Sequence, residues 1–138
     1  MSYEFTTHWK NAMTFETNID QHTVKFDTFT EFGGNDLAAS PKKVFLTTLA
    51  GCTGMDVVSI LQKMKVDFSS FSITAKAEIS EEHPKVFTEI TLTYQFQSDI
   101  DNLDKIKKAI QLSQNKYCGI SAMLKKVCPI YYSVEILS

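Results

Sequence analysis

The spacing of apolar and polar positions changes along the chain, and each pattern predicts a different element. Residues 3–32 are rich in β-forming side chains, and apolar and polar residues alternate from Val24 to Asp27. A cluster of turn-forming residues at 33–36 follows this stretch. We therefore expect a meander of two or three strands in the first 32 residues.

Ser40 and Pro41 mark the start of a long helix. Serine is a preferred N-cap, and proline at the first helical position loses nothing because that N–H would be unpaired in any case. The apolar periodicity predicts that the helix continues to about Lys65. From Val44 to Met55 the residues are apolar or small nearly all round, which is typical of a helix buried on most sides.

The second half of the chain mixes strands and helices. Alternating runs at 71–79 and 86–96 flank a turn at 80–84 and predict a hairpin. Asp101 and Asn102 are expected to cap a second helix that ends near Tyr117. A short helix at 121–126 and a strand at 130–136 complete the order. This order indicates an α+β fold, with residues 1–138 in a single domain.

Composition and charge narrow the function classes. The 138 residues fit one domain, and 43% apolar with 22% charged residues is an ordinary soluble composition. The net charge is −2, and the fourteen basic residues, all of them lysine, are spread along the chain. Because a phosphate backbone requires a basic face, we expect no nucleic-acid partner.

The pattern of apolar residues also bears on localisation. No apolar run approaches the ~20 residues that are needed to cross a bilayer. The polar and aromatic N-terminus lacks the apolar region of a signal peptide. We therefore expect a cytoplasmic protein without membrane association, whose three cysteines are reduced thiols.

The residue pattern leaves the role of two cysteines open. Cys52 falls about three turns into the long helix, where the helix dipole no longer lowers a thiol pKa. It is either a small buried packing residue or a thiol activated by a neighbouring cation or hydrogen-bond donor. Cys118 falls at a break between helices, and the same two interpretations apply. Cys128, just before Pro129, is interpreted as structural.

The spacing of the histidines and glycines does not indicate a metal site, a cofactor site or a hydrolase. His8, His22 and His83 show no ligand-like spacing to the cysteines, and neither phosphate-binding glycine pattern is present. We therefore expect no metal and no cofactor. His83 is the nearest candidate base for a cysteine nucleophile, but it falls in the predicted hairpin turn.

Three segments of the chain resemble the OsmC/Ohr family. Residues 40–55 (SPKKVFLTTLAGCTGM) and 112–124 (LSQNKYCGISAML) are similar to the family's two cysteine segments. Residues 82–88 (EHPKVFT) resemble a hairpin of the YhfA-like branch of OsmC proteins. The resemblance covers essentially the whole chain. It implies an intertwined homodimer in which long central helices pack together and are wrapped by antiparallel sheets.

The resemblance also implies a redox function. Well-known members of the family are thiol-dependent peroxidases of the stress response, which reduce organic hydroperoxides. Carried over, Cys52 would attack the peroxide, and Cys118 would resolve the sulfenic acid to a disulfide that a thiol reductant reopens. The expected partners are a second copy of the chain and a small hydroperoxide or thiol ligand.

Two positions depart from the pattern of the family's peroxidases. Lys42 stands where they carry a glutamate, and Lys10 lies near the position of an arginine that this glutamate holds. Lysine supplies a point charge without the planar fork of arginine. Lys10 and Lys42 are therefore the candidate stabilisers of a Cys52 thiolate. The alternative is a non-catalytic dimer that binds a small ligand, or one associated with stress whose cysteines only pack.

Overall fold

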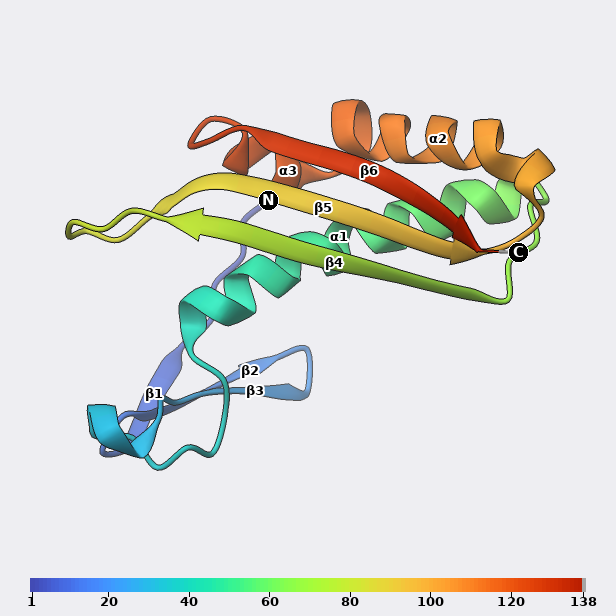
Figure 1. Ribbon diagram of the computed structural model, residues 1–138. Coiled ribbons are helices and arrows are strands. Elements are labelled where there is room, and N and C mark those ends of the chain that lie inside the picture. The colour runs from blue at the N-terminus through green and yellow to red at the C-terminus, as the bar shows by residue number, and fades with distance from the viewer. Residues whose placement is uncertain (138) are drawn as a thin grey trace. The chain divides into compact units, whose positions relative to one another are not determined.

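The computed structural model describes residues 1–137, and its contacts divide the chain into two compact units (Figure 1). The first unit is Met1–Phe45, and the second begins at Leu46. The long helix α1, Pro41–Lys63, begins in the first unit and has most of its length in the second. The two units are described separately below.

The first unit contains the predicted meander. Strands β1 (Thr7–Asn11), β2 (Thr14–Ile19) and β3 (His22–Phe26) pair antiparallel in that order. A 3-10 turn, Thr30–Phe32, follows them. The buried Asp27 holds this region together, because its carboxylate accepts hydrogen bonds from Thr14 Oγ1 and from the backbone N–H groups of Thr28, Asn35 and Leu37. Burial alone would raise the pKa of Asp27, but these four hydrogen bonds lower it.

The second unit is built on a three-stranded sheet in the order β4–β5–β6. Strands β4 (Ser70–Ile79) and β5 (Phe87–Gln97) form the predicted hairpin. Strand β6 (Ile130–Leu137) pairs parallel with β5, so the expectation of purely antiparallel sheets is wrong for this sheet. Parallel pairing requires a crossover connection, and helices supply it here. The crossover contains a 3-10 turn (Ile100–Asn102), α2 (Leu103–Leu112), a π-helical turn (Ser113–Tyr117) and α3 (Gly119–Leu124).

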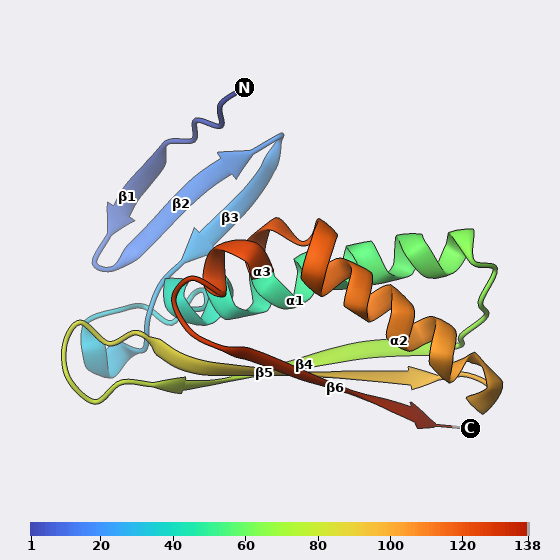
Figure 2. The same ribbon diagram turned by 90° about the horizontal axis from the view of Figure 1, so that it is seen from above.

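The helices of the second unit cover one face of this sheet (Figure 2). Alternate residues of β5 point into the core, and Ile90, Leu92, Tyr94 and Phe96 are fully buried. Helix α1 meets them with one stripe at four-residue spacing, Leu49, Thr53, Val57 and Leu61. Helix α2 adds Ile106, Ala109 and Ile110. The core therefore lies between the helices and the β5 face.

Both ends of α1 have a clear physical cause. The Ser40 carbonyl accepts the first helical hydrogen bond, from Val44 N–H, so Ser40 is the N-cap as predicted. At the other end Lys65 has a φ of +58°, and the N–H of Lys65 bonds to Gln62 O while that of Val66 bonds to Leu61 O. These bonds form a Schellman motif. With lysine in place of the usual glycine, the sequence does not show that the helix stops at Lys63.

The start of the second helix differs from the prediction. Asp99, rather than Asp101 or Asn102, supplies the capping side chain, and its Oδ1 accepts a hydrogen bond from Asp101 N–H at 2.8 Å. The side chain of Asn102 instead donates to Ser98 Oγ. A 3-10 turn at residues 100–102 separates the cap from α2, which moves the cap two residues toward the N-terminus.

Helix α1 is less buried within one chain than the sequence predicts. Only its stripe on the sheet is buried, while Phe45 and Met55 are exposed. By length and composition this helix could cross a membrane, with a mean hydropathy of 1.7 over 18 residues, so the expectation that no stretch approaches such a length is wrong. A single helix of this kind is weak evidence for a membrane span, because core helices pass the same test.

Candidate functional site

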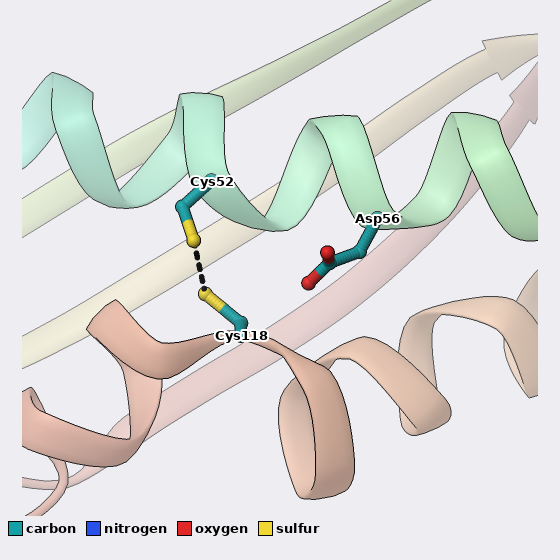
Figure 3. A group of neighbouring side chains, drawn as sticks. All are labelled: Cys52, Asp56 and Cys118. Carbon is teal, nitrogen blue, oxygen red and sulfur yellow. Dashed lines mark hydrogen bonds between the residues drawn. The ribbon is translucent and has the colours of Figure 1, made fainter. Parts of the chain in front are cut away.

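Cys52 and Cys118 come together within the second unit of a single chain. Their sulfur atoms lie 3.2 Å apart, within hydrogen-bonding distance for thiols (Figure 3). Cys118 is buried, and Cys52 is half-buried. Both are free thiols in this structure. A disulfide needs an S–S distance of about 2.05 Å, so closing the pair requires the sulfurs to approach by about 1.2 Å.

A π-helical turn places Cys118 beside α1. The backbone N–H of Cys118 donates to Ser113 O at 2.8 Å, which is the wide five-residue spacing of a π turn. The backbone at Cys118 is extended, and the residue is the N-cap of α3. Its sulfur accepts a hydrogen bond from Ser121 N–H at 3.3 Å. The end of one helix and the start of the next therefore fix the orientation of this thiol.

Asp56 is the third member of the site. It follows Cys52 by four residues on α1, so both side chains leave the same face of the helix. The two sulfurs and a carboxylate oxygen of Asp56 all lie within 4.8 Å of one another. Ser113 Oγ donates to Asp56 Oδ2 at 3.0 Å and holds the carboxylate in place (Figure 3 shows Asp56 facing the thiol pair).

A buried network of polar side chains ties the site to the sheet. Thr53 Oγ1 lies 2.7 Å from Tyr94 OH on β5 and 2.8 Å from Ser113 Oγ. Gln114 Nε2 donates to both Thr53 Oγ1 and Tyr94 OH, at 3.2 Å and 3.0 Å. Burial raises the pKa of Tyr94 to about 12, so its hydroxyl keeps its proton at neutral pH. Thr53, which follows Cys52, and Gln114, four residues before Cys118, are thus anchored to the same tyrosine.

Removing the Tyr94 hydroxyl tests this anchoring. We expect Tyr94→Phe to lower the free energy of unfolding by about 1–3 kcal/mol, because Gln114 and Thr53 lose a buried partner. Urea denaturation monitored by circular dichroism measures the change. The matched control is Tyr131→Phe on β6, an exposed tyrosine at which we expect less than about 0.5 kcal/mol. Equal stabilities for the two variants would contradict the anchoring role.

The surroundings of Cys52 hold its thiol in the protonated form. Burial is the largest cause of its raised pKa, and the hydrogen bond with Cys118 raises the pKa further. The backbone N–H of Ile120 acts in the opposite direction, while the charge of Asp56 adds to the increase. Within this unit, Cys52 is therefore positioned for disulfide chemistry without being strongly activated.

The reactivity of Cys52 toward an alkylating agent should show the raised pKa. Only the thiolate reacts, so we expect the alkylation rate to climb with pH and reach its midpoint above the ordinary thiol value of 9.0. Peptide mass spectrometry of iodoacetamide-treated Cys128→Ala protein, from pH 6 to pH 11, gives the profile. The same protein in urea is the control and should titrate at the lower, ordinary value. A midpoint near neutral pH in the folded protein would contradict the inferred environment.

The other candidate residues lie outside this cluster. Lys10 is on β1 and forms an ion pair with Glu16 at 3.8 Å. Lys42 is exposed in the first turn of α1. Both belong to the first unit, so their role toward Cys52 stays a prediction. Cys128 is buried in the core, as the structural interpretation expects, and His83 is exposed in the β4–β5 turn.

Asp56 and the buried network were not predicted from the sequence. The four-residue spacing from Cys52 to Asp56 on a helix was a readable signal, because such residues share a face. Ser113, Gln114 and Tyr94 carried no comparable signal, since the π turn, β5 and α1 meet only in the folded chain.

The fold and the site together define a dithiol protein built on an α+β scaffold. Residues 33–133 match the model of the family described as "OsmC-like protein". The chain therefore belongs to the OsmC-like family. It is 31% identical over 131 residues to the protein YhfA of Escherichia coli K12. The aligned residues are 94% of this chain and 95% of that relative.

Solved structures agree with this assignment at the level of the fold. An OsmC-like protein from Mycoplasma pneumoniae has a TM-score of 0.84 and 16% identity, covering 100% of this chain and 99% of the other. A structure from Legionella pneumophila, described as an organic hydroperoxide resistance protein OsmC and a predicted redox protein, has a TM-score of 0.70 and 17% identity. That match covers 96% of this chain and 97% of the other.

Proposed function

We propose that this protein is a thiol-dependent peroxidase that reduces organic hydroperoxides through Cys52 and Cys118. The observation that carries the proposal is the 3.2 Å distance between the two sulfurs within one chain. The name of the Legionella pneumophila structure, an organic hydroperoxide resistance protein, supports the substrate class for this fold. The half-buried Cys52 is the more accessible thiol, which suits the residue that meets the peroxide.

The proposed reaction has two steps on the protein. The Cys52 thiolate attacks one peroxide oxygen, and the O–O bond breaks to give a Cys52 sulfenic acid and an alkoxide, which takes up a proton to leave as the alcohol. The Cys118 sulfur then attacks the Cys52 sulfur, and water leaves as the disulfide forms. An external dithiol returns both cysteines to thiols and is itself oxidised to a disulfide. The peroxide is thus reduced by two electrons that the external dithiol supplies.

Thiolate formation is the demanding step, because burial holds the pKa of Cys52 above its ordinary value. The backbone N–H of Ile120 favours the thiolate, and Lys10 or Lys42 would supply the positive charge expected from the family resemblance. We therefore expect the peroxidase rate to increase with pH above neutrality.

A single-turnover experiment tests the proposal. Reduced protein receives one equivalent of an organic hydroperoxide, and mass spectrometry of the unreduced digest identifies the linked peptides. We expect a Cys52–Cys118 disulfide and a free Cys128, and the Cys128→Ala variant should give the same link. Free thiols at both Cys52 and Cys118 after oxidant treatment would overturn the peroxidase and favour the non-catalytic alternative.

We further propose that the protein acts as a homodimer through the exposed side of α1. A groove of about 600 Å³ lies there, lined by Gly51, Gly54, Met55 and Val58 of α1 and by Phe71 and Ile73 of β4. Packing within the chain explains why residue 54 is a glycine, since an added Cβ would lie 3.2 Å from Ile73 Cδ1. At Gly51, by contrast, no atom of residues 1–137 outside the surrounding turns of α1 lies within 4 Å of the Cβ position, so the single chain gives no reason for a glycine there. A mid-helix glycine lowers stability, so close approach of a second α1 would give it a purpose.

A further inference from the structure

Three side chains at the thiol pair have the donor atoms and spacing of a metal site. Cys52, Asp56 and Cys118 each offer one ligand atom, and these atoms lie within 4.8 Å of one another. They come from two parts of the chain, α1 and the break before α3, so the folded scaffold assembles the set. We infer that they bind one thiophilic divalent cation of the Zn²⁺ type. This inference is independent of the proposed peroxidase.

The sulfur separation suits a shared metal ion as well as a disulfide. Zn²⁺ binds thiolate sulfur at about 2.3 Å with tetrahedral angles, which places two sulfurs about 3.8 Å apart. The observed 3.2 Å lies between this distance and that of a disulfide. Side-chain rotation can increase the distance between the two sulfurs by about 0.6 Å. The same pair of cysteines can therefore either form a disulfide or bind one metal ion.

Hydrogen bonds from neighbouring residues orient two of the three ligands, Asp56 and Cys118. Ser113 Oγ donates to Asp56 Oδ2 at 3.0 Å and leaves the carboxylate with lone pairs for an ion. Ser121 N–H donates to Cys118 Sγ at 3.3 Å, which fixes that sulfur. Hydrogen bonds of this kind to first ligands orient metal sites in proteins.

Two buried oxygens on residues close to Cys118 in the sequence lack a hydrogen-bond partner in the described part of the chain. Gln114 Oε1 and Ser121 Oγ find no hydrogen-bond partner within residues 1–137. Buried polar atoms are normally paired, so unpaired ones require an explanation. Three protein ligands leave a tetrahedral ion with one open position, which a water molecule can take.

The ligand chemistry selects the class of ion. Two thiolates favour thiophilic ions, and a carboxylate is an accepted third ligand for Zn²⁺. Mg²⁺ and Ca²⁺ prefer six or more oxygen ligands, which the cluster of Cys52, Asp56 and Cys118 does not offer. A bound ion would also hold the sulfurs apart and block the Cys52–Cys118 disulfide.

A Co²⁺ titration of the full-length reduced protein under anaerobic conditions tests the site, with Zn²⁺ as competitor. We expect one Co²⁺ per chain, a thiolate-to-cobalt charge-transfer band, and its loss when Zn²⁺ displaces the cobalt. Asp56→Asn should weaken Zn²⁺ binding by at least about tenfold. The matched control Asp67→Asn, an exposed aspartate after α1, and Cys128→Ala should bind as the wild type does.

Oxidation by diamide supplies a second readout. One equivalent of Zn²⁺ should slow formation of the Cys52–Cys118 disulfide in the wild type, and a chelator should restore it. Asp56→Asn should still form the disulfide when no metal is added, which shows that its fold and sulfur pair are intact. The absence of a charge-transfer band would overturn the inference. Equal Zn²⁺ affinity in the wild type and Asp56→Asn would also overturn it, because the two thiols alone would then be binding the ion.

Discussion

Replacing Cys52 with serine should lower the steady-state rate of organic hydroperoxide consumption, with a dithiol as reductant, by roughly 100-fold or more. A serine hydroxyl cannot attack the O–O bond as a thiolate does, and the buried Cys118 is the less accessible sulfur of the pair. A coupled assay of peroxide loss measures the rate. Circular dichroism confirms that the variant is folded.

The Cys118→Ser variant separates attack from resolution. Cys52 keeps its sulfur there, so we expect one turnover of peroxide to leave a sulfenic acid at Cys52 that a sulfenic-acid reagent traps. Cys128→Ala is the matched control, because Cys128 is a buried core residue outside the cluster of Cys52, Asp56 and Cys118, and the variant should retain close to the wild-type rate. Wild-type turnover in Cys52→Ser would contradict the assignment of the nucleophile.

Local patterns predicted most of the elements, and their errors have local causes. The alternation of β4 and β5 and the Ser40-Pro41 start of α1 appear in the structure where the sequence places them. The end of α1 differs from the prediction, because Lys65 adopts a left-handed conformation that is usually taken by glycine. The parallel pairing of β6 was also missed, since strand order depends on the crossover path and leaves no mark in the alternation.

The site was predictable only in part, for the same reason. The family resemblance paired Cys52 with Cys118, and the structure brings their sulfurs to 3.2 Å. Asp56 shares a helix face with Cys52, but its closeness to Cys118 depends on a π turn that no propensity announces. Long-range contacts therefore supply both the network that supports the site and the position of Asp56, the third donor of the proposed metal site.

Introducing a charge into the α1 groove should convert the proposed dimer into a monomer. Met55 is 76% exposed in the single chain and lines the groove beside Val58. If a second α1 covers it, Met55→Glu buries an unpaired carboxylate, and we expect the dimer dissociation constant to increase by at least about 100-fold. Sedimentation equilibrium should give twice the chain mass for the wild type and the chain mass for the variant.

Met123→Glu is the matched control, because Met123 is 61% exposed on α3 outside the groove. It adds the same charge at the same residue type, so an unchanged dimer there ties the effect to the α1 surface. A wild-type protein that is monomeric at all concentrations would contradict the homodimer proposal. The exposed apolar side of α1 would then be expected to bind something other than a second copy of the chain. Partition of the protein into lipid vesicles would distinguish binding to a membrane from binding to a different protein.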